Sequence, residues 1–131
     1  MHLDVITTPV EDRNTGFAAV RIHDADNHVS CSLDINFSQI FETTNFIPQR
    51  ALDFLFCAAV VYAIDKHVGR QRFSEDGWTR ELAVRVPVTE PDLWNSHAEQ
   101  FSECVSFLTG DLWDFTFVAL PQSLAFPPRH F

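Results

Sequence analysis

The chain has 131 residues, 46% of them hydrophobic and thirteen of them Phe, which is enough for one domain with a real core. A formal net charge of -9 and a pI near 4.9 argue against non-specific binding to nucleic acid or to an anionic membrane, because both need a surplus of Lys and Arg. Three cysteines are too few for a disulfide framework, the first residues lack a signal-peptide pattern, and the longest apolar run is too short to span a bilayer. We therefore expect a soluble, cytoplasmic protein.

Three strands are expected in the first third of the chain. Residues 3–8 are rich in β-formers and end at Pro9, and residues 16–23 and 29–35 follow. In residues 29–35 apolar and polar side chains alternate, which is typical of a half-buried strand. Turn-forming Asp and Asn residues separate the last two segments, so these two strands are expected to form a hairpin.

A long helix is expected from Pro48 to about Val68, with proline in its first turn and Gly69 after its end. Residues 52–64 are apolar on nearly all sides of this helix. Either both sides are covered within the fold, or one side is covered and another awaits a partner. The second possibility makes a homo-oligomer one of the expected partner states.

The second half of the chain predicts strand, helix and strand. Residues 80–88 alternate clearly, and Thr89 precedes a Pro in the position of a hydroxyl N-cap. The helix is expected to end at Gly110, before a strand at residues 113–117 with an aromatic face. The expected apolar stripe of the helix consists of Trp94, His97, Ala98, Phe101, Cys104, Val105 and Leu108.

These elements follow the order β-β-β-α-β-α-β and predict an α+β fold, in which a mainly antiparallel sheet carries both helices on one face. A ferredoxin-like variant is the expected topology. Residues 1–120 are expected to form the single domain. Residues 121–131 contain three prolines and no periodicity, which indicates a linker or a docking tail.

No familiar catalytic motif accompanies this fold. The four glycines are isolated, so no glycine-rich phosphate loop exists, and no catalytic residue, metal or cofactor is expected. His23, Asp24, Asp26 and His28 could gather around a metal, but a polar hairpin tip explains them as well. The cysteines are expected on core faces, where they act as small apolar residues, and His97 is expected at the edge of the core.

The most suggestive polar cluster lies between the long helix and the strand at residues 80–88. It consists of Asp65, Arg70, Arg72, Trp78 and Arg80, with Asp76 nearby. One interpretation is an ion-pair network that holds the connection in place. The other is an anion-binding or partner-binding site, or the pocket of a small enzyme, in which Trp78 stacks beside the arginines.

Four sequence elements together resemble a known family. They are RALDFLFCAAVVYAIDKHVGR, DGWTRELAVRVPV, LWN, and VSFLTGDLWDFTF. Their combination is similar to the N-terminal region of QueC-like proteins of bacterial antiphage defence systems, including the Qat type, which are relatives of 7-cyano-7-deazaguanine synthase. The resemblance covers residues 46–117.

In that family an ATP-pyrophosphatase domain follows, opening with a Ser-Gly-Gly-x-Asp-Ser loop. The printed chain contains no such loop, so the resemblance does not imply nucleotide chemistry here. It implies a binding role, either as an N-terminal domain of such a protein or as a free-standing homologue. The implied partner is a QueC-like catalytic subunit or another defence component.

Overall fold

The computed structural model describes residues 1–8, 17–24, 26, 29–36, 49–74 and 76–120 of the chain. Five strands form one sheet in the order β3-β2-β1-β4-β5. The strands are β1 (His2–Thr8), β2 (Phe17–Asp24), β3 (Val29–Asn36), β4 (Glu81–Val88) and β5 (Leu112–Ala119). The helices are α2 (Gln49–His67), α3 (Arg70–Phe73), α4 (Pro91–Ser96) and α5 (Ala98–Thr109).

The sheet is mixed, with β2 antiparallel to the other four strands. β1 pairs antiparallel with β2, and β2 pairs antiparallel with β3, whereas β1 with β4 and β4 with β5 pair in parallel. Helical connections return the chain to the end from which each parallel strand starts, which a short hairpin turn cannot do. The α+β fold class is confirmed. The sheet is mixed and not mainly antiparallel as predicted, because antiparallel pairing is limited to β1–β3. The ferredoxin-like strand order is not confirmed.

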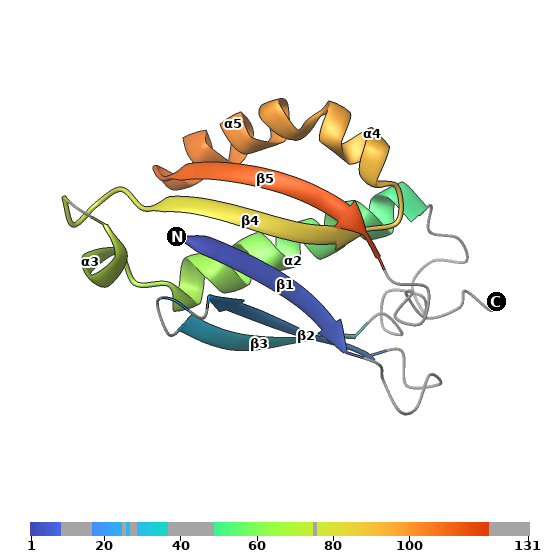
Figure 1. Ribbon diagram of the computed structural model, residues 1–131, viewed down its shortest axis with the longest axis horizontal. Helices are drawn as coiled ribbons and strands as arrows, with labels where there is room; N and C mark the ends of the chain where they lie inside the picture. The colour runs from blue at the N-terminus through green and yellow to red at the C-terminus, as the bar shows by residue number, and fades with distance from the viewer. Residues whose placement is uncertain (9–16, 25, 27–28, 37–48, 75, 121–131) are drawn as a thin grey trace.

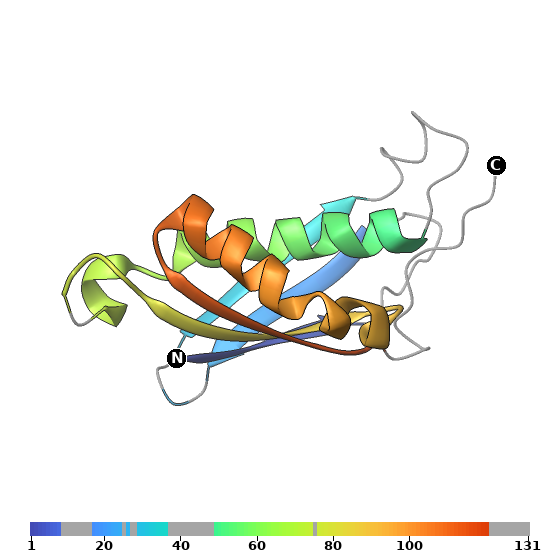
Figure 2. The same ribbon diagram turned by 90° about the horizontal axis from the view of Figure 1, so that it is seen from above.

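The helices α2, α4 and α5 lie on the same face of the sheet (Figure 2). The chain steps from β1 to β4 and from β4 to β5 in the same direction across the sheet. Crossover connections almost always have the same hand, so two steps in one direction place both helical layers on one face. The other face carries polar side chains, among them Asp4, Arg85 and Thr116, which are exposed.

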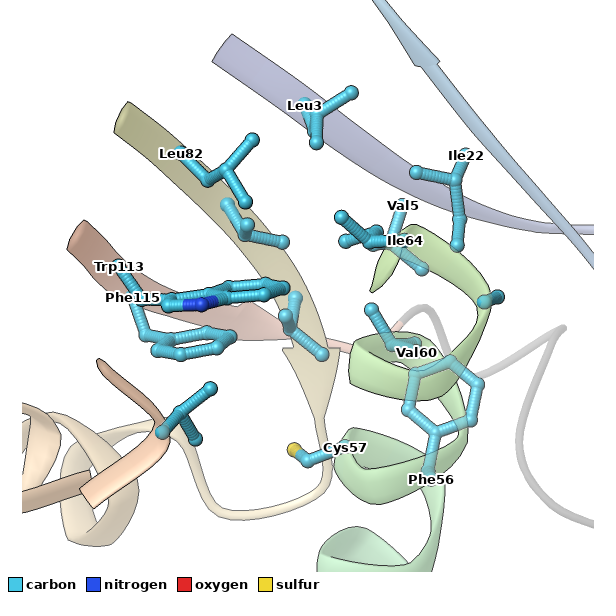
Figure 3. Close-up of a cluster of buried hydrophobic side chains, with 14 of the residues drawn as sticks. Leu3, Val5, Ile22, Phe56, Cys57, Val60, Ile64, Leu82, Trp113 and Phe115 are labelled. Atoms are coloured by element: carbon cyan, nitrogen blue, oxygen red, sulfur yellow. The ribbon is translucent and has the colours of Figure 1, made fainter. Parts of the chain in front are cut away.

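The core lies between this helical layer and the sheet (Figure 3). β1, β2, β4 and β5 contribute every second side chain to it, as the alternation in the sequence predicts. From α2 the buried apolar side chains are those of Leu52, Phe56, Cys57, Val60, Ala63 and Ile64. The rings of Trp113, Phe115 and Phe117 stack along β5, with interplanar angles of 7° and 12° between successive rings. In the described ranges, no helix has the length and apolar character needed to cross a membrane.

The second predicted helix is in fact two helices, α4 and α5, that meet at His97. Because the helix is interrupted there, one continuous stripe cannot face the core throughout. Val105 is buried as predicted, but Cys104 and Leu108 are exposed, contrary to the core positions predicted for them. His97, predicted at the edge of the core, is also exposed. Gly110 ends α5 in the left-handed conformation with φ 77°, as expected.

The start of α4 also differs from its prediction. The N-cap is Glu90 without a side-chain cap hydrogen bond, and the hydroxyl of Thr89 donates to Asp53 instead. The short helix α3 was not predicted. Residues 121–131, the predicted linker or docking tail, lie outside the described residues, as does His28 of the hairpin tip.

Candidate functional site

Arg80 forms the centre of the predicted polar cluster. It lies immediately before β4, and its side chain is 0% exposed. Its backbone forms an isolated antiparallel β-bridge with Ser74. The guanidinium binds Asp111 through two parallel bonds, one of them from Nε to Oδ1 at 3.1 Å. It also donates to the Asp65 carboxylate at 2.6 Å and to the carbonyl oxygen of Val68 at 2.6 Å. One side chain therefore ties the end of α2 to the starts of β4 and β5.

All five N–H groups of Arg80 have acceptors. Nε donates to Asp111, Nη1 donates to the carbonyl oxygens of Val68 and Asp65, and Nη2 donates to both carboxylates. A guanidinium has five donors and no acceptor, so none remains for an added ligand. An anion at this position would have to displace one of the two carboxylates.

Arg70 reinforces the same cluster from α3. Its Nη1 donates to Asp111 at 2.8 Å and to the carbonyl oxygen of Trp78 at 3.0 Å. Its Nη2 donates to the carbonyl oxygen of Thr109 at 2.9 Å and lies 3.4 Å from Asp65. Two arginines thus meet two aspartates, and the four formal charges cancel. The cluster is consistent with the predicted ion-pair network.

The charges in this cluster hold each other in the ionised form. Burial alone would raise the pKa of the Asp111 carboxyl, but the hydrogen bonds and charge of Arg80, together with the charge of Arg70, lower it below its ordinary value. Burial alone would lower the pKa of Arg80, and its bonds to Asp111 and Asp65 raise it instead. Arg80 and Asp111 are therefore both charged at neutral pH.

The other predicted members lie exposed around this network. The Trp78 side chain is 76% exposed, and only its backbone carbonyl contacts Arg70. Arg72 is exposed on α3. Asp76 accepts hydrogen bonds from the backbone N–H groups of Trp78 and Thr79, which lowers its pKa and forms the turn that places Trp78 outward. A ligand-binding role for this cluster stays a prediction.

Sequence reasoning missed Asp111, the carboxylate that contacts both arginines. It lies directly after Gly110 and 31 residues from Arg80, a separation that no local pattern connects. Because Asp111 directly follows the glycine that ends the helix, its presence was explained by the helix end, and its pairing with arginine was not predicted. The parallel pairing of β4 with β5 brings the two residues together, because the N–H of Leu112 donates to the carbonyl oxygen of Arg80.

A second polar centre, also missed, is Asp53 on α2. Its carboxylate is fully buried and accepts the backbone N–H of Thr89 at 3.0 Å, the Thr89 hydroxyl at 2.7 Å and the indole N–H of Trp94 at 3.1 Å. Asp53 thereby joins α2 to the end of β4 and to α4. The available signal was its charge, since it is the one ionisable carboxylate in the apolar run of residues 51–64.

An apolar groove opens beside Asp53, between the first turns of α2 and the helix α4. Its volume is about 480 Å³, larger than two hollows of about 290 and 260 Å³ on the outer face of the sheet. The groove is lined by Arg50, Ala51, Phe54, Leu93, Trp94 and His97. Phe54 is 57% exposed here. The surface can therefore accept apolar groups without rearrangement of the helices.

Among the remaining chemical candidates, Asp24 and Cys57 occupy buried structural positions. At the hairpin tip, Asp24 is buried and accepts the backbone N–H of Asp26 at 2.9 Å, as a turn residue does. The described part of the chain holds no group of three or more His, Cys, Asp and Glu residues suited to a metal ion. Burial and the nearby charge of Asp53 raise the pKa of Cys57 to about 12, so this thiol stays protonated.

Comparison with protein-family models, with curated proteins and with solved structures finds no match to this chain. The resemblance to QueC-like proteins therefore stays a prediction based on the sequence elements that carry it.

Proposed function

We propose that this chain is a non-catalytic protein-interaction domain of a bacterial antiphage defence system. Its partner is a protein, either a QueC-like catalytic subunit or another component of the same system. The observation that carries the proposal is the open apolar groove between α2 and α4. The family resemblance of residues 46–117 supplies the biological context.

The groove has the properties of a protein-docking surface. Aromatic side chains from two helices line it, and Asp53 fixes the distance between those helices through its bonds to Thr89 and Trp94. A groove with fixed walls loses little conformational entropy when a partner binds. The apolar face of a helix is the common occupant of such a groove between helices.

The charge around the groove indicates the composition of the partner. Glu90 and Asp92 lie at the start of α4. Among the described residues that line the groove, Arg50 is the one Lys or Arg, and it is paired with Glu90 at 3.0 Å. The whole chain carries a net charge of -9. We therefore expect the partner segment to place apolar side chains in the groove and basic side chains beside it.

The proposal includes a cytoplasmic location, supported by the three free cysteines at positions 31, 57 and 104. Self-association is the alternative partner state. Self-association is compatible with a protein partner in the groove, because a different surface of the chain can form the contact between two copies.

Co-expression with the products of the adjacent genes tests the proposal. Phe54→Glu places a charge in the groove, and Tyr62→Glu is the matched control, since Tyr62 is an equally exposed aromatic residue (64%) on the same helix outside the groove. We expect F54E to weaken binding at least about tenfold and to abolish phage protection in a plaque assay. We expect Y62E to leave both unchanged.

Three outcomes would contradict the proposal. A chain that binds none of the adjacent gene products contradicts the interaction role. Full binding by F54E contradicts the groove as the docking surface. Full binding without any effect of the operon on plaque numbers contradicts the defence role alone.

A further inference from the structure

The two edges of the sheet are completed differently. At the β5 edge, alternate backbone N–H groups point away from β4 and are each taken by a side chain of α4 or α5. Trp113 donates to Ser106 at 2.9 Å, Phe115 donates to Ser102 at 3.1 Å, and Phe117 donates to the Asn95 side chain at 2.9 Å. This edge is therefore covered and cannot accept another strand.

The β3 edge lacks such protection in the described part of the chain. All eight residues of β3 pair with β2 in an unbroken register, without a bulge. The strand contains one charged residue, Asp34, and neither Lys nor Pro. Figure 1 shows β3 at the margin of the sheet, with no described helix beside its outer edge. Long, regular edge strands of this composition are the ones that pair with another chain.

The hydrophobic core is also incomplete on this side. Val29, Cys31 and Leu33 face the core from β3 but are only half-buried, whereas their counterparts on β5 are buried. On α2, Leu55 and Ala59 are half-buried as well. The 100° spacing of helical residues puts these two on the flank opposite Asp65 and Phe54, toward β3. Among the described residues, backbone groups and apolar side chains are thus both left uncovered at this edge.

We infer that β3 pairs antiparallel with β3 of a second copy of this chain, across a two-fold axis. A foreign strand would satisfy the open backbone groups but would leave Leu55 and Ala59 uncovered. A second copy brings its own α2 to the same place, so each core margin covers the other. The inference does not depend on the groove between α2 and α4.

The side chains specify the register of this pairing. Directly opposite residues must point to the same face of the sheet, so a core-facing residue must meet a core-facing one. An axis at Asp34 would set two carboxylates opposite each other. An axis at Ser32 instead places Cys31 opposite Leu33 and Ser30 opposite Asp34. We place the axis at Ser32, which keeps the two carboxylates apart and lies near the middle of β3.

Light scattering and sedimentation of the whole chain test the inference. We expect a dimer of twice 15.0 kDa. Ser32→Lys puts two ammonium groups opposite each other and should raise the dimer dissociation constant roughly tenfold or more. Thr116→Lys is the matched control, because Thr116 is exposed on the same face of the covered edge strand β5. T116K should stay dimeric, and circular dichroism should show both variants folded.

A cross-link tests the register independently. In a background of Cys31→Ser and Cys104→Ser, oxidation of Ser32→Cys should give a covalent dimer, and Thr116→Cys should not. A wild-type chain that remains monomeric at all accessible concentrations would overturn the inference. So would a dimer that S32K leaves intact. If the chain is a monomer and S32K abolishes its binding to an adjacent gene product, the partner of β3 is a strand of that product and not a second copy of this chain.

Discussion

Arg80 and Asp111 form an ion pair in which both side chains are completely removed from solvent. The pair joins residues 31 positions apart and lies where α2, β4 and β5 meet. Buried ion pairs are costly to desolvate, so their net contribution to stability is small, but removing one partner leaves an unpaired buried charge. The first prediction follows from this asymmetry.

Arg80→Ala should lower the free energy of unfolding by about 3–5 kcal/mol, because Asp111 and Asp65 then lose their main cation. Arg70→Ala should cost less, about 1–2 kcal/mol, because its side chain is partly exposed. Urea unfolding followed by tryptophan fluorescence measures both. An R80A chain of unchanged stability would instead favour the ligand-binding interpretation of the cluster.

Acid should weaken the same network. The pKa of Asp111 is lowered in the folded chain, so its contribution to stability is complete above the unfolded value of about 3.9. The contribution is lost as the pH falls through the folded value, since protonation breaks the bonds to Arg80. Unfolding free energies between about pH 7 and pH 2 should therefore fall steeply at the acid end. Asp111→Asn should flatten that slope, and an equal slope in both chains would contradict the assignment.

Asp53→Asn should destabilise the chain by about 2–3 kcal/mol, because an amide nitrogen would face a donor from Thr89 or Trp94. The change should also loosen the groove, so Trp94 fluorescence should shift before global unfolding. Thr89→Ser retains the hydroxyl bonded to Asp53 and serves as the control. Equal effects of D53N and T89S would show that Asp53 does not hold the two helices.

Gly110→Ala should cost about 1 kcal/mol, because a Cβ strains the left-handed backbone there. Outside Gly110 and its two neighbours in the chain, no described atom lies within 4 Å of that Cβ position, so the loss would be conformational strain without a clash. Gly69→Ala is the matched control, since it also has open space but φ -67°. G69A should be neutral or stabilising by up to about 1 kcal/mol. Thermal unfolding of both variants would reveal the difference.

Thiol labelling of the native chain should proceed in order of burial. Cys104 is exposed and should react first, whereas Cys57, with its pKa raised to about 12, should react only after unfolding. Cys104→Ser should remove the fast phase. A fast phase that survives in C104S would place another thiol at the surface.

Much of the fold could be predicted because its causes are local. The alternation in residues 80–88 and the proline that precedes α2 each indicate an element within a few residues of its observed bounds. The break between α4 and α5 at His97 was not predicted, because the spacing of apolar residues in the sequence continues across it. Asp65, Arg70 and Arg80 were correctly grouped, since 15 residues or fewer separate them, but Asp111 and Asp53 find their partners through distant strand and helix packing.

By itself the sequence determined where the five strands and the long helix α2 lie, and that the chain combines an acidic composition with one apolar core. Those properties depend on side-chain periodicity and composition, which act over a few neighbouring residues. Only the tertiary structure decided that Arg80 has no free donor, that a groove opens beside Asp53, and that side chains of α4 and α5 cover the β5 edge while no described helix covers the β3 edge. Each of these depends on the order of strands in the sheet, because that order sets which distant residues become neighbours.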